Sequence, residues 1–540
     1  MTVDPITAEI VKSSLIYASE EMGIAVRNSA YSPNIKERLD HSCALFDKHA
    51  RLIAQAEHIP VHLGSLPWGL RATLAVIERE YGGVREGEMW VVNDPYISGT
   101  HLNDVTVIRP VFFRGELAGY AANKAHHTDV GGMVPGSMSA DAGDLFAEGL
   151  VMPPTRLVEH DCAVEPTVAL FRANSRTPHA RSGDLRAQTA GNYTGERRML
   201  ELYERYGTPI MEAAIERLLD DSETRMRHAL RELGEGTFEQ RDVLEDRDGA
   251  PSIDLVLRLT LRDGTALFDY AGTAAQLTFP MNAVYGVTLS GVYYALRAVT
   301  DPTIPMNEGC FRPVRVDVPE GTLLNPLRPA PVGGGNVETS TRNADLVLGA
   351  LAQAAPQRVP AASGGTMSNV MLGGTRTGGG TWAFYETNGC GMGARPTMDG
   401  IDGVQCHMTN TLNTPIEAIE REFPLRIVRY EFAEGTGGSG RYRGGNGLIR
   451  AIQLTEGTAR ASLLAERHVV RPHGANGGGD GACGKHTILD AGGAEKRTGA
   501  KATFAFAPGE TIVVQTPGGG GYGFGEGVAT RAAGGTVPPH

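Results

Sequence analysis

The sequence contains no apolar run that approaches the roughly 18 residues of a membrane-spanning helix. Its first residues also lack the basic stretch followed by an apolar stretch that marks a secretory signal, so we expect a cytoplasmic protein. The six cysteines form no Cys-x-x-Cys pair, which argues against zinc ribbons and thioredoxin-like redox sites. Their wide spacing does not indicate a disulfide framework, and we expect reduced, mostly buried thiols.

Two common catalytic motifs are also absent. No Gly-x-x-x-x-Gly-Lys-Ser/Thr segment occurs, so the sequence predicts no phosphate-binding P-loop. No Gly-x-Ser-x-Gly segment occurs, which argues against a serine hydrolase triad. Lys and Arg number 50 against 62 Asp and Glu, giving a net charge of -12. No basic stripe is present, and a nucleic-acid-binding protein is therefore not expected.

The composition is otherwise that of a globular protein with excess glycine. Apolar residues make up 41% and charged residues 21% of the chain, which is enough apolar surface to build cores. Glycine accounts for 70 of 540 residues, nearly twice the usual share of roughly 7%, without a Gly-X-Y repeat. We expect many tight turns and close backbone packing. The length predicts two to four domains.

Local patterns predict an α+β fold with several domains. Asp4 as a cap and Pro5 in the first turn predict a helix over residues 5–29. Thr208-Pro209 opens a second long helix that Gly234 closes. Alternating apolar residues over 253–261 predict a half-buried strand. Further elements are strands at 89–92 and 105–108, hairpin turns at Asp248-Gly249 and Asp263-Gly264, and a helix over 343–355.

These patterns divide the chain into four predicted regions. Between residue 31 and about 190 the pattern is mixed, with short strand-like runs and loops rich in His, Asp and Gly. The last hundred residues show short strands and almost no helix signal. We therefore predict a mixed α/β N-terminal catalytic region with a metal site (1–207), a bridging helix (208–234), a mixed, glycine-rich middle region (235–425) and a β-rich C-terminal domain (426–540).

Histidine is concentrated near the N-terminus. Seven of the 15 histidines lie in residues 1–130, where even spacing would place about 3.6. Segments 37–43, 99–104 and 125–132 each carry His beside Asp. Imidazole together with carboxylate suits zinc, manganese or iron. Two His and two Asp would neutralise a dication and leave a position for water, although a lone His-x-x-Asp is more often a capped loop.

Eight segments, in order, resemble the hydantoinase B/oxoprolinase family. They are Ile35–Asp47, Ile59–Ser65, Asn93–Tyr96, Gly99–Asp104, Asn336–Ser340, Ser363–Met367, Thr409–Pro415 and Thr516–Gly523. The likeness covers nearly the whole chain and is specific for the family but not for a substrate. In carboxylase relatives a divalent metal is held by positions that match Asp40, His101, Asp104 and His126. The resemblance thus implies a zinc or manganese ion at these residues, with His126 preferred over His127.

The resemblance also implies a partner and a reaction. Family members work beside a hydantoinase A-type, actin-like ATPase subunit, in hetero-oligomers such as α2β2. They include hydantoinases, 5-oxoprolinases and lactamases. We therefore expect a metal-dependent subunit of an ATP-dependent cyclic amide hydrolase, whose substrate ring is activated by phosphorylation in the partner. The alternatives are a subunit of an ATP-dependent ketone carboxylase and a non-catalytic scaffold for the ATPase chain.

The remaining candidate residues have competing interpretations. His62 is a candidate general base or substrate contact, and a structural histidine is an equal alternative. Asp129 is expected to orient a ligand imidazole or accept its N–H. Cys390 is not expected to be a nucleophile, because relatives usually carry glycine there. His407 is a pocket residue or, more often, a core residue. Gly518–Gly521 follow a predicted strand, but no helix begins after them, so tight turns or a subunit contact are favoured over phosphate binding.

Overall fold

The computed structural model describes residues 3–56 and 58–525 and has the α+β, multi-domain architecture expected from the sequence. The start of the first predicted region (1–2) and the end of the last one (526–540) lie outside the described residues. The helices are α1 (Pro5–Ser29), α2 (Pro33–Lys36), α3 (His62–Tyr81), α4 (Pro95–Ser98), α5 (Leu145–Glu148), α6 (Glu165–Ala173), α7 (Pro178–Tyr206), α8 (Thr208–Glu232), α9 (Tyr285–Val299), α10 (Ser340–Ala354) and α11 (Ile416–Glu422). Within the described residues, every helix is too short or too polar to cross a membrane.

A seven-stranded antiparallel sheet forms the N-terminal part of the molecule. Its order is β2-β1-β5-β4-β3-β6-β7. The strands are β1 (His41–Asp47), β2 (Leu52–Gln55), β3 (Met89–Val92), β4 (Asp104–Phe113), β5 (Glu116–His126), β6 (Thr155–Glu159) and β7 (Cys162–Ala163). Both faces are covered. Cys43 and Leu45 of β1 pack towards α1 and α7, whereas Ala44 and Phe46 join a larger core that reaches α3 and α9.

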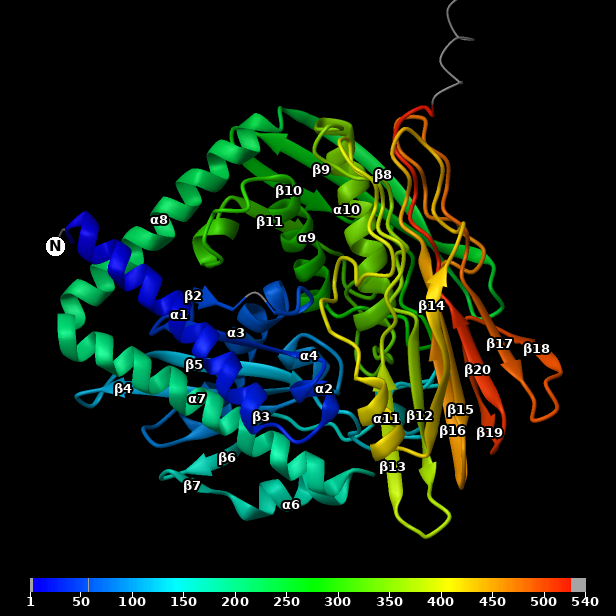
Figure 1. The fold of residues 1–540 in the computed structure, drawn as a ribbon. Coiled ribbons are helices and arrows are strands. Elements are labelled where there is room, and N and C mark those ends of the chain that lie inside the picture. The colour runs from blue at the N-terminus through cyan, green and yellow to red at the C-terminus, as the bar shows by residue number, and fades with distance from the viewer. Residues whose placement is uncertain (1–2, 57, 526–540) are drawn as a thin grey trace, which may run out of the picture.

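A second sheet lies at the top of Figure 1, between α8 and α10. Its order is β11-β10-β9-β8, and the strands are β8 (Gly236–Glu245), β9 (Pro251–Arg262), β10 (Thr265–Asp269) and β11 (Val314–Asp317). The predicted strand and both predicted hairpin turns are confirmed, because β9 pairs with β8 and β10 across them. Helix α8 contacts α1 and β2 as well as β9 and β10, so it touches two of the sheets.

The remaining two sheets form a β-sandwich on the right of Figure 1. One has the order β13-β12-β16-β19: β12 (Asn369–Thr375), β13 (Thr381–Glu386), β16 (Thr458–Leu464) and β19 (Lys501–Phe506). The other has the order β14-β15-β20-β17-β18: β14 (Leu425–Ala433), β15 (Gly447–Leu454), β17 (Lys485–Leu489), β18 (Glu495–Thr498) and β20 (Thr511–Gln515). Side chains of both sheets share one core, which includes Leu372, Leu463 and Val514. The β-rich C-terminal part is confirmed, and it also recruits β12 and β13, which precede residue 426.

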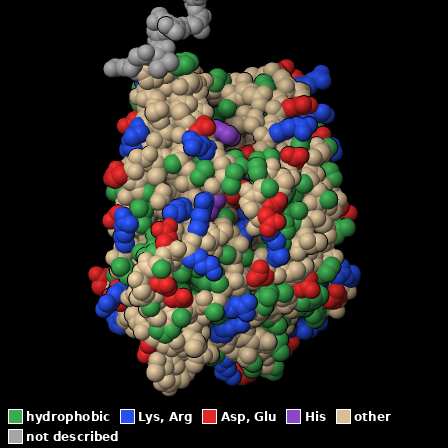
Figure 2. All heavy atoms as spheres, turned by 90° about the vertical axis from the view of Figure 1, so that its right-hand side faces the viewer, with side chains coloured by type: hydrophobic (Ala, Val, Ile, Leu, Met, Phe, Trp, Pro, Cys, Tyr) green, Lys and Arg blue, Asp and Glu red, His purple; other side chains and the backbone are tan. Residues whose placement is uncertain are grey.

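The sandwich side of the molecule carries mixed charge. Figure 2 shows acidic and basic side chains interspersed over this face rather than gathered by sign. On this face the side chains therefore create no large field of a single sign. This view therefore agrees with the absence of a basic stripe from the sequence.

The glycine run of the C-terminal end is buried among this chain's own backbone. Gly519 accepts a hydrogen bond from the Gly438 N–H and donates one to the Gly445 carbonyl. Gly520 is bonded in the same way to Ala394 and Ala362. A Cβ at Gly519 would lie 2.2 Å from the Met392 carbonyl oxygen, so no side chain fits there. The run supplies close backbone packing within the chain.

Candidate metal centre

Three strand ends of the seven-stranded sheet meet at one place. Strand β4 begins at Asp104, β5 ends at His126, and antiparallel pairing places these two residues directly opposite each other. Strand β1 begins one residue after Asp40, whose carbonyl accepts the His126 N–H at 3.0 Å. The side chains of directly opposed residues are neighbours, so pairing alone brings distant parts of the sequence together.

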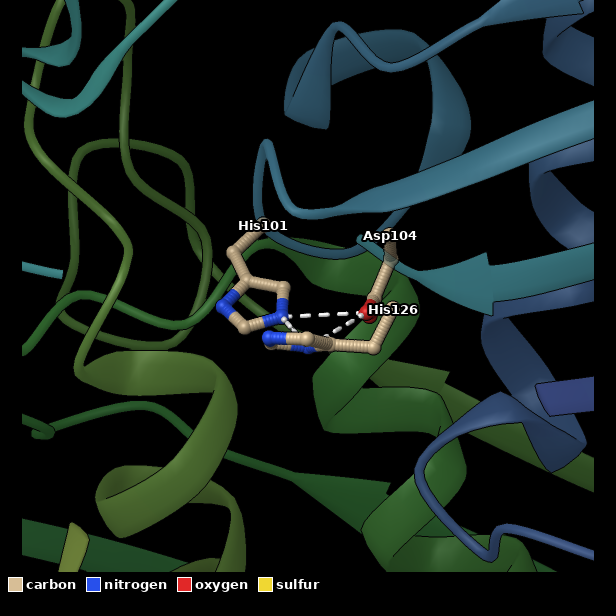
Figure 3. A group of neighbouring side chains, drawn as sticks. All are labelled: His101, Asp104 and His126. Carbon is tan, nitrogen blue, oxygen red and sulfur yellow. Dashed lines mark hydrogen bonds and ion pairs between the residues drawn. The ribbon is translucent and has the colours of Figure 1, made fainter. Parts of the chain in front are cut away.

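His101 reaches the same place from the turn that precedes β4. The Asp104 N–H donates to the His101 carbonyl at 3.1 Å, which closes this turn. His101 Nε2 then lies 3.0 Å from Asp104 Oδ1 and 3.2 Å from His126 Nδ1. The third side of the triangle, from His126 Nδ1 to Asp104 Oδ1, is 3.2 Å. Figure 3 shows the three side chains pointing towards one another, and all three are fully buried.

The hydrogen bond that His101 makes with its other ring nitrogen, Nδ1, fixes which ring nitrogen carries the proton. His101 Nδ1 lies 3.3 Å from the Gly333 carbonyl oxygen, which can only accept, so the Nδ1 atom carries the proton. In the neutral ring, the Nε2 lone pair therefore faces the carboxylate oxygen of Asp104. Either a proton on Nε2 or a metal ion must therefore lie between these two atoms. Ligand atoms about 2.1 Å from a tetrahedral metal ion lie about 3.4 Å apart, which is close to the spacing seen here.

The ionisation of the cluster suits a metal ion. Burial alone would raise the pKa of Asp104, but contacts with His101, His126 and His62 hold that pKa well below its usual range. Burial lowers the pKa of His126 and of His62, so both rings are neutral. Burial also opposes the charge of His101, but the Asp104 carboxylate outweighs it and raises the His101 pKa. A metal ion would replace that proton.

The second oxygen of Asp104 is also held. His62, the first residue of α3, places Nε2 3.4 Å from Asp104 Oδ2, and its Nδ1 lies 2.9 Å from Ser42 Oγ. The carboxylate can only accept, so His62 donates from Nε2 and accepts the Ser42 hydroxyl proton at Nδ1. Asn336 Nδ2 lies 3.5 Å from the same Asp104 oxygen. Asp104 is therefore fixed on both oxygens, which limits its motion when it binds an ion.

A buried carboxylate orients His101 from behind. Glu148 accepts hydrogen bonds from the Val332 N–H at 3.0 Å and the Gly333 N–H at 2.7 Å. The Gly333 carbonyl in turn accepts the His101 Nδ1 proton. Burial raises the pKa of Glu148 to about 7. Nothing in the local sequence singles out Glu148, so its place behind the cluster emerges only from the fold.

Lys124 steadies the turn that carries His101. Its buried ammonium donates to the Ser98 carbonyl at 2.7 Å and to Thr100 Oγ1 at 2.9 Å. Burial lowers the pKa of Lys124 to about 7. These bonds join β5 to the loop between α4 and β4, so the approach of His101 to His126 is supported from the sheet.

Asp40 lies on the wall of the cavity beside the cluster. Asp40, His62 and Asp104 line this cavity together with Asn336 and Tyr385, and its volume is about 20 Å³. Such a volume holds one water molecule or one ion. The three residues His101, Asp104 and His126 have ligand atoms that all lie within 4.8 Å of one another, and Asp40 is outside that group. The structure thus brings three of the four predicted ligands together, and Asp40 stays a prediction as the fourth.

Two other predicted residues have defined partners elsewhere. The Asp129 carboxylate accepts hydrogen bonds from the Gly131 and Gly136 N–H groups and from the Arg176 guanidinium at 2.9 Å. It therefore organises the loop that follows β5, and its predicted contact with an imidazole stays untested. The His127 ring points away from the cluster, where its Nε2 lies 2.9 Å from Gln188 Oε1. This agrees with the preference for His126.

The less favoured candidates lie away from the cluster. The six cysteines are unbridged, and Cys43 and Cys390 are buried as expected. His407 Nε2 lies 3.0 Å from Asp345 Oδ1, which is the buried structural role given as the commoner alternative. Sequence reasoning missed Ser42. The only sequence feature that could have indicated it is its place inside the family-like segment Ile35–Asp47.

Comparison with known proteins decides the family. The profile of the hydantoinase B/oxoprolinase family matches residues 4–524. The chain belongs to this family. It is 46% identical to an uncharacterised protein of Methanocaldococcus jannaschii, over 96% of this chain and 91% of that protein. It is also 33% identical to a putative D-/L-hydantoinase subunit of a Pseudomonas species, over 90% of this chain and 84% of that protein.

Two further relatives show how much of a longer protein and of a solved structure this chain matches. The 5-oxoprolinase 1 of Arabidopsis thaliana is 35% identical over 96% of this chain, but the match spans only 42% of that longer protein. The crystal structure of the ATP-dependent caprolactamase of Pseudomonas jessenii superposes with a TM-score of 0.91 at 31% identity. That superposition covers 97% of this chain and 92% of the caprolactamase chain, so the two share the same fold throughout.

Proposed function

We propose that this chain is the metal-dependent subunit of an ATP-dependent enzyme that opens cyclic amides. The names of the relatives support this, because hydantoins, 5-oxoproline and caprolactam all contain a ring amide. The word subunit in one name, and the greater length of the 5-oxoprolinases, support a partner chain that supplies the ATPase. We propose a hydantoinase A-type chain as that partner.

The observation that carries the proposal is the triangle of possible ligand atoms in His101, Asp104 and His126, which lie 3.0 to 3.2 Å from one another. These three residues would hold a zinc or manganese ion, with Asp40, on the wall of the adjoining cavity, as the proposed fourth ligand. When bound, such an ion activates water and polarises a carbonyl group. The surrounding residues keep the donors in place, since Glu148 acts through Gly333 on His101, and His62 holds the second oxygen of Asp104.

The chain also offers an unsatisfied polar atom to a substrate beside the cluster. Asn336 Oδ1 lies in the cavity wall, is buried and has no hydrogen-bond partner among residues 3–56 and 58–525. A buried acceptor without a partner is costly, and an N–H or O–H group of the substrate would satisfy it. We assign Asn336 to substrate orientation. His62 is neutral and hydrogen-bonded to Ser42 and Asp104, which makes it a positioning residue and a candidate for proton transfer.

The proposed reaction uses the partner for activation. A ring amide is stabilised by resonance, and phosphorylation of its oxygen by ATP in the partner would give the carbon a good leaving group. In this chain the carbon then takes an oxygen from water, the C–N bond breaks and the ring nitrogen takes the two protons of that water, which leaves an acyl phosphate. A second water then cleaves the bond between the acyl group and phosphate. The products are the ring-opened carboxylate and phosphate.

The test uses the complex purified with its ATPase subunit. His101→Ala removes one corner of the triangle, and His228→Ala, on the exposed surface of α8, is the matched control. We expect His101→Ala to lose bound metal and at least 100-fold in ring-opening rate, while the control keeps both. Persistence of both metal and ring opening in His101→Ala would refute the proposal. Product formation from a ketone that depends on bicarbonate would instead favour the carboxylase alternative.

A further inference from the structure

The two imidazoles of the triangle are held in different ways. His101 Nδ1 donates to the Gly333 carbonyl at 3.3 Å, which fixes that ring from behind. His126 turns Nδ1 towards the triangle, and its Nε2 atom is buried without a hydrogen-bond partner among residues 3–56 and 58–525. In most metal sites, a hydrogen bond to the second ring nitrogen sets the orientation of a histidine ligand. Among the described residues, packing therefore sets the orientation of the His126 ring.

Tyr385 of β13 lies flat against His126. The centroids of the two rings are 4.7 Å apart and their planes are inclined by 21°, so the rings are stacked. Both side chains are buried. His126 ends a strand of the N-terminal sheet, whereas Tyr385 belongs to the sandwich. Stacked rings attract each other beyond the area that they bury, so this contact opposes tilting of the imidazole.

The Tyr385 ring is itself held on its face, at its backbone and at its hydroxyl. The guanidinium carbon of Arg38 lies 4.8 Å from the ring centroid, and Arg38 Nη1 donates to the Tyr385 carbonyl at 3.1 Å. The Tyr385 hydroxyl donates to Asn369 Oδ1 at 2.9 Å. Asn369 Nδ2 in turn donates to Glu338 Oε1 at 2.7 Å and to the Leu464 carbonyl at 2.9 Å. The ring is therefore a rigid support.

The Tyr385 hydroxyl is not placed for proton transfer. Its proton is committed to Asn369, and burial raises the pKa of Tyr385 further above its ordinary value. The phenol therefore stays neutral at physiological pH. Its contribution to the metal centre comes from the face of the ring rather than from an acid or base.

We propose that Tyr385 is a positioning residue of the metal centre, whose ring fixes the plane of His126 as the Gly333 carbonyl fixes that of His101. Nδ1 of His126 then stays directed at the triangle. The sandwich thereby completes a site whose three clustered side chains come from the N-terminal part of the chain. For the bound ion this inference rests on the proposed function, but the position of His126 can be tested without metal.

Three variants separate the ring from the hydroxyl and from general packing. Tyr385→Leu removes the ring, and Tyr385→Phe keeps the ring but loses the hydrogen bond to Asn369. Phe384→Leu is the matched control, because it removes a buried ring from the neighbouring position of β13, in the core of the sandwich. Tyr385→Ile is a second variant without the ring, so the test does not depend on the folding of one protein.

Two measurements are made on each folded variant. In zinc binding by competition with a chelator, we expect the affinity of Tyr385→Leu to fall about 10-fold, and those of Tyr385→Phe and Phe384→Leu to stay within about threefold of the wild type. In metal-free crystals, the 3.2 Å distance between His126 Nδ1 and Asp104 Oδ1 should be kept in those two variants and lost in Tyr385→Leu.

Two results would overturn the role of the Tyr385 ring. One is a Tyr385→Leu variant with the zinc affinity and the His126 position of Phe384→Leu. The other is a Tyr385→Phe variant that loses as much as Tyr385→Leu, which would assign the effect to the hydroxyl. A wild-type chain that binds no zinc would refute the proposed function instead, while the metal-free crystals would still test the position of His126.

Discussion

Asp104 and His126 face each other across β4 and β5, with Oδ1 and Nδ1 only 3.2 Å apart in the buried interior. This relationship is set by strand register rather than by a flexible loop. A slip of one residue in either strand would turn its side chain to the opposite face of the sheet and part the pair. The metal centre therefore depends on the same hydrogen bonds that hold the sheet together, which makes its geometry rigid.

The charge of Asp104 is predicted to be essential for metal binding. Asp104→Asn keeps the shape of the side chain but removes the anion that faces three imidazoles. We expect metal affinity to fall at least 100-fold, measured by competition with a chelator. Asp141→Asn, at an exposed position, is the control and should bind metal as the wild type does. Equal affinity in both variants would exclude Asp104 as a ligand.

Glu148 is predicted to act on the metal through His101. Glu148→Gln replaces one acceptor oxygen by a donor opposite the Val332 and Gly333 N–H groups. The Gly333 carbonyl should then lose its alignment with His101 Nδ1, and we expect metal affinity to fall about 10–100-fold. A purely structural role would lower the melting temperature without this change. The two effects are separated by measuring metal affinity at a temperature where the variant is fully folded.

Asn336 is predicted to affect substrate more than metal. Asn336→Ala removes the unpartnered Oδ1 acceptor from the cavity wall and leaves His101, Asp104 and His126 in place. We expect KM for the ring amide to rise about 10-fold, as one buried hydrogen bond is lost. Metal content should stay near that of the wild type. An unchanged KM would remove Asn336 from the substrate site.

The sandwich should lose stability in acid because of a half-buried histidine. Burial, together with Lys501 and Arg497, lowers the pKa of His468 to about 4. Between pH 6.5 and 4 the unfolded chain binds a proton at His468 that the folded chain does not, so stability falls as the pH falls. We expect His468→Gln to remove on the order of 1 kcal/mol per pH unit of this slope. Urea unfolding at pH 6.5 and 5 measures it, and an unchanged slope contradicts the assignment.

Local signals predicted the elements that carry their own start and stop residues. The Asp4 side chain does accept the N–H groups of Ile6 and Thr7 at the start of α1. Helix α8 runs from Thr208 to Glu232, as Thr208-Pro209 at its start and Gly234 after its end indicated. These features depend only on residues that are close in sequence, so the sequence alone was sufficient to predict them.

Helix α7 was not predicted, because its glycines disfavour an isolated helix and are explained only by contacts with another helix. The region up to about residue 190 was expected to be mixed, but Pro178–Tyr206 form one continuous helix. Its glycines are unfavourable for an isolated helix, yet they allow α1 to approach closely. A Cβ at Gly191 would lie 2.5 Å from Val26 Cγ2, and one at Gly195 would lie 2.5 Å from Met22 Sδ. Tertiary contact outweighs the local propensity.

The metal centre was predicted in outline, and its supports were not. The residue types and their family-like segments indicated His101, Asp104 and His126, which the fold brings together. Glu148 lies outside all of these segments, Gly333 lies just before Asn336–Ser340, and only the packing of α5 against the loop around Gly333 places both behind His101. Contacts of this kind carry no local pattern. The division into four regions stays a prediction. Its last boundary crosses a sheet, because β12 and β13 pair with strands that follow residue 426.

The most direct test of the account is the position of a bound metal ion. Crystals of the chain grown with zinc or manganese should show one anomalous-difference peak between His101 Nε2, Asp104 Oδ1 and His126 Nδ1, about 2.1 Å from each atom. Such a peak would confirm the triangle as a ligand set. No peak at this position under saturating metal, or a peak only at another site, would contradict the central claim.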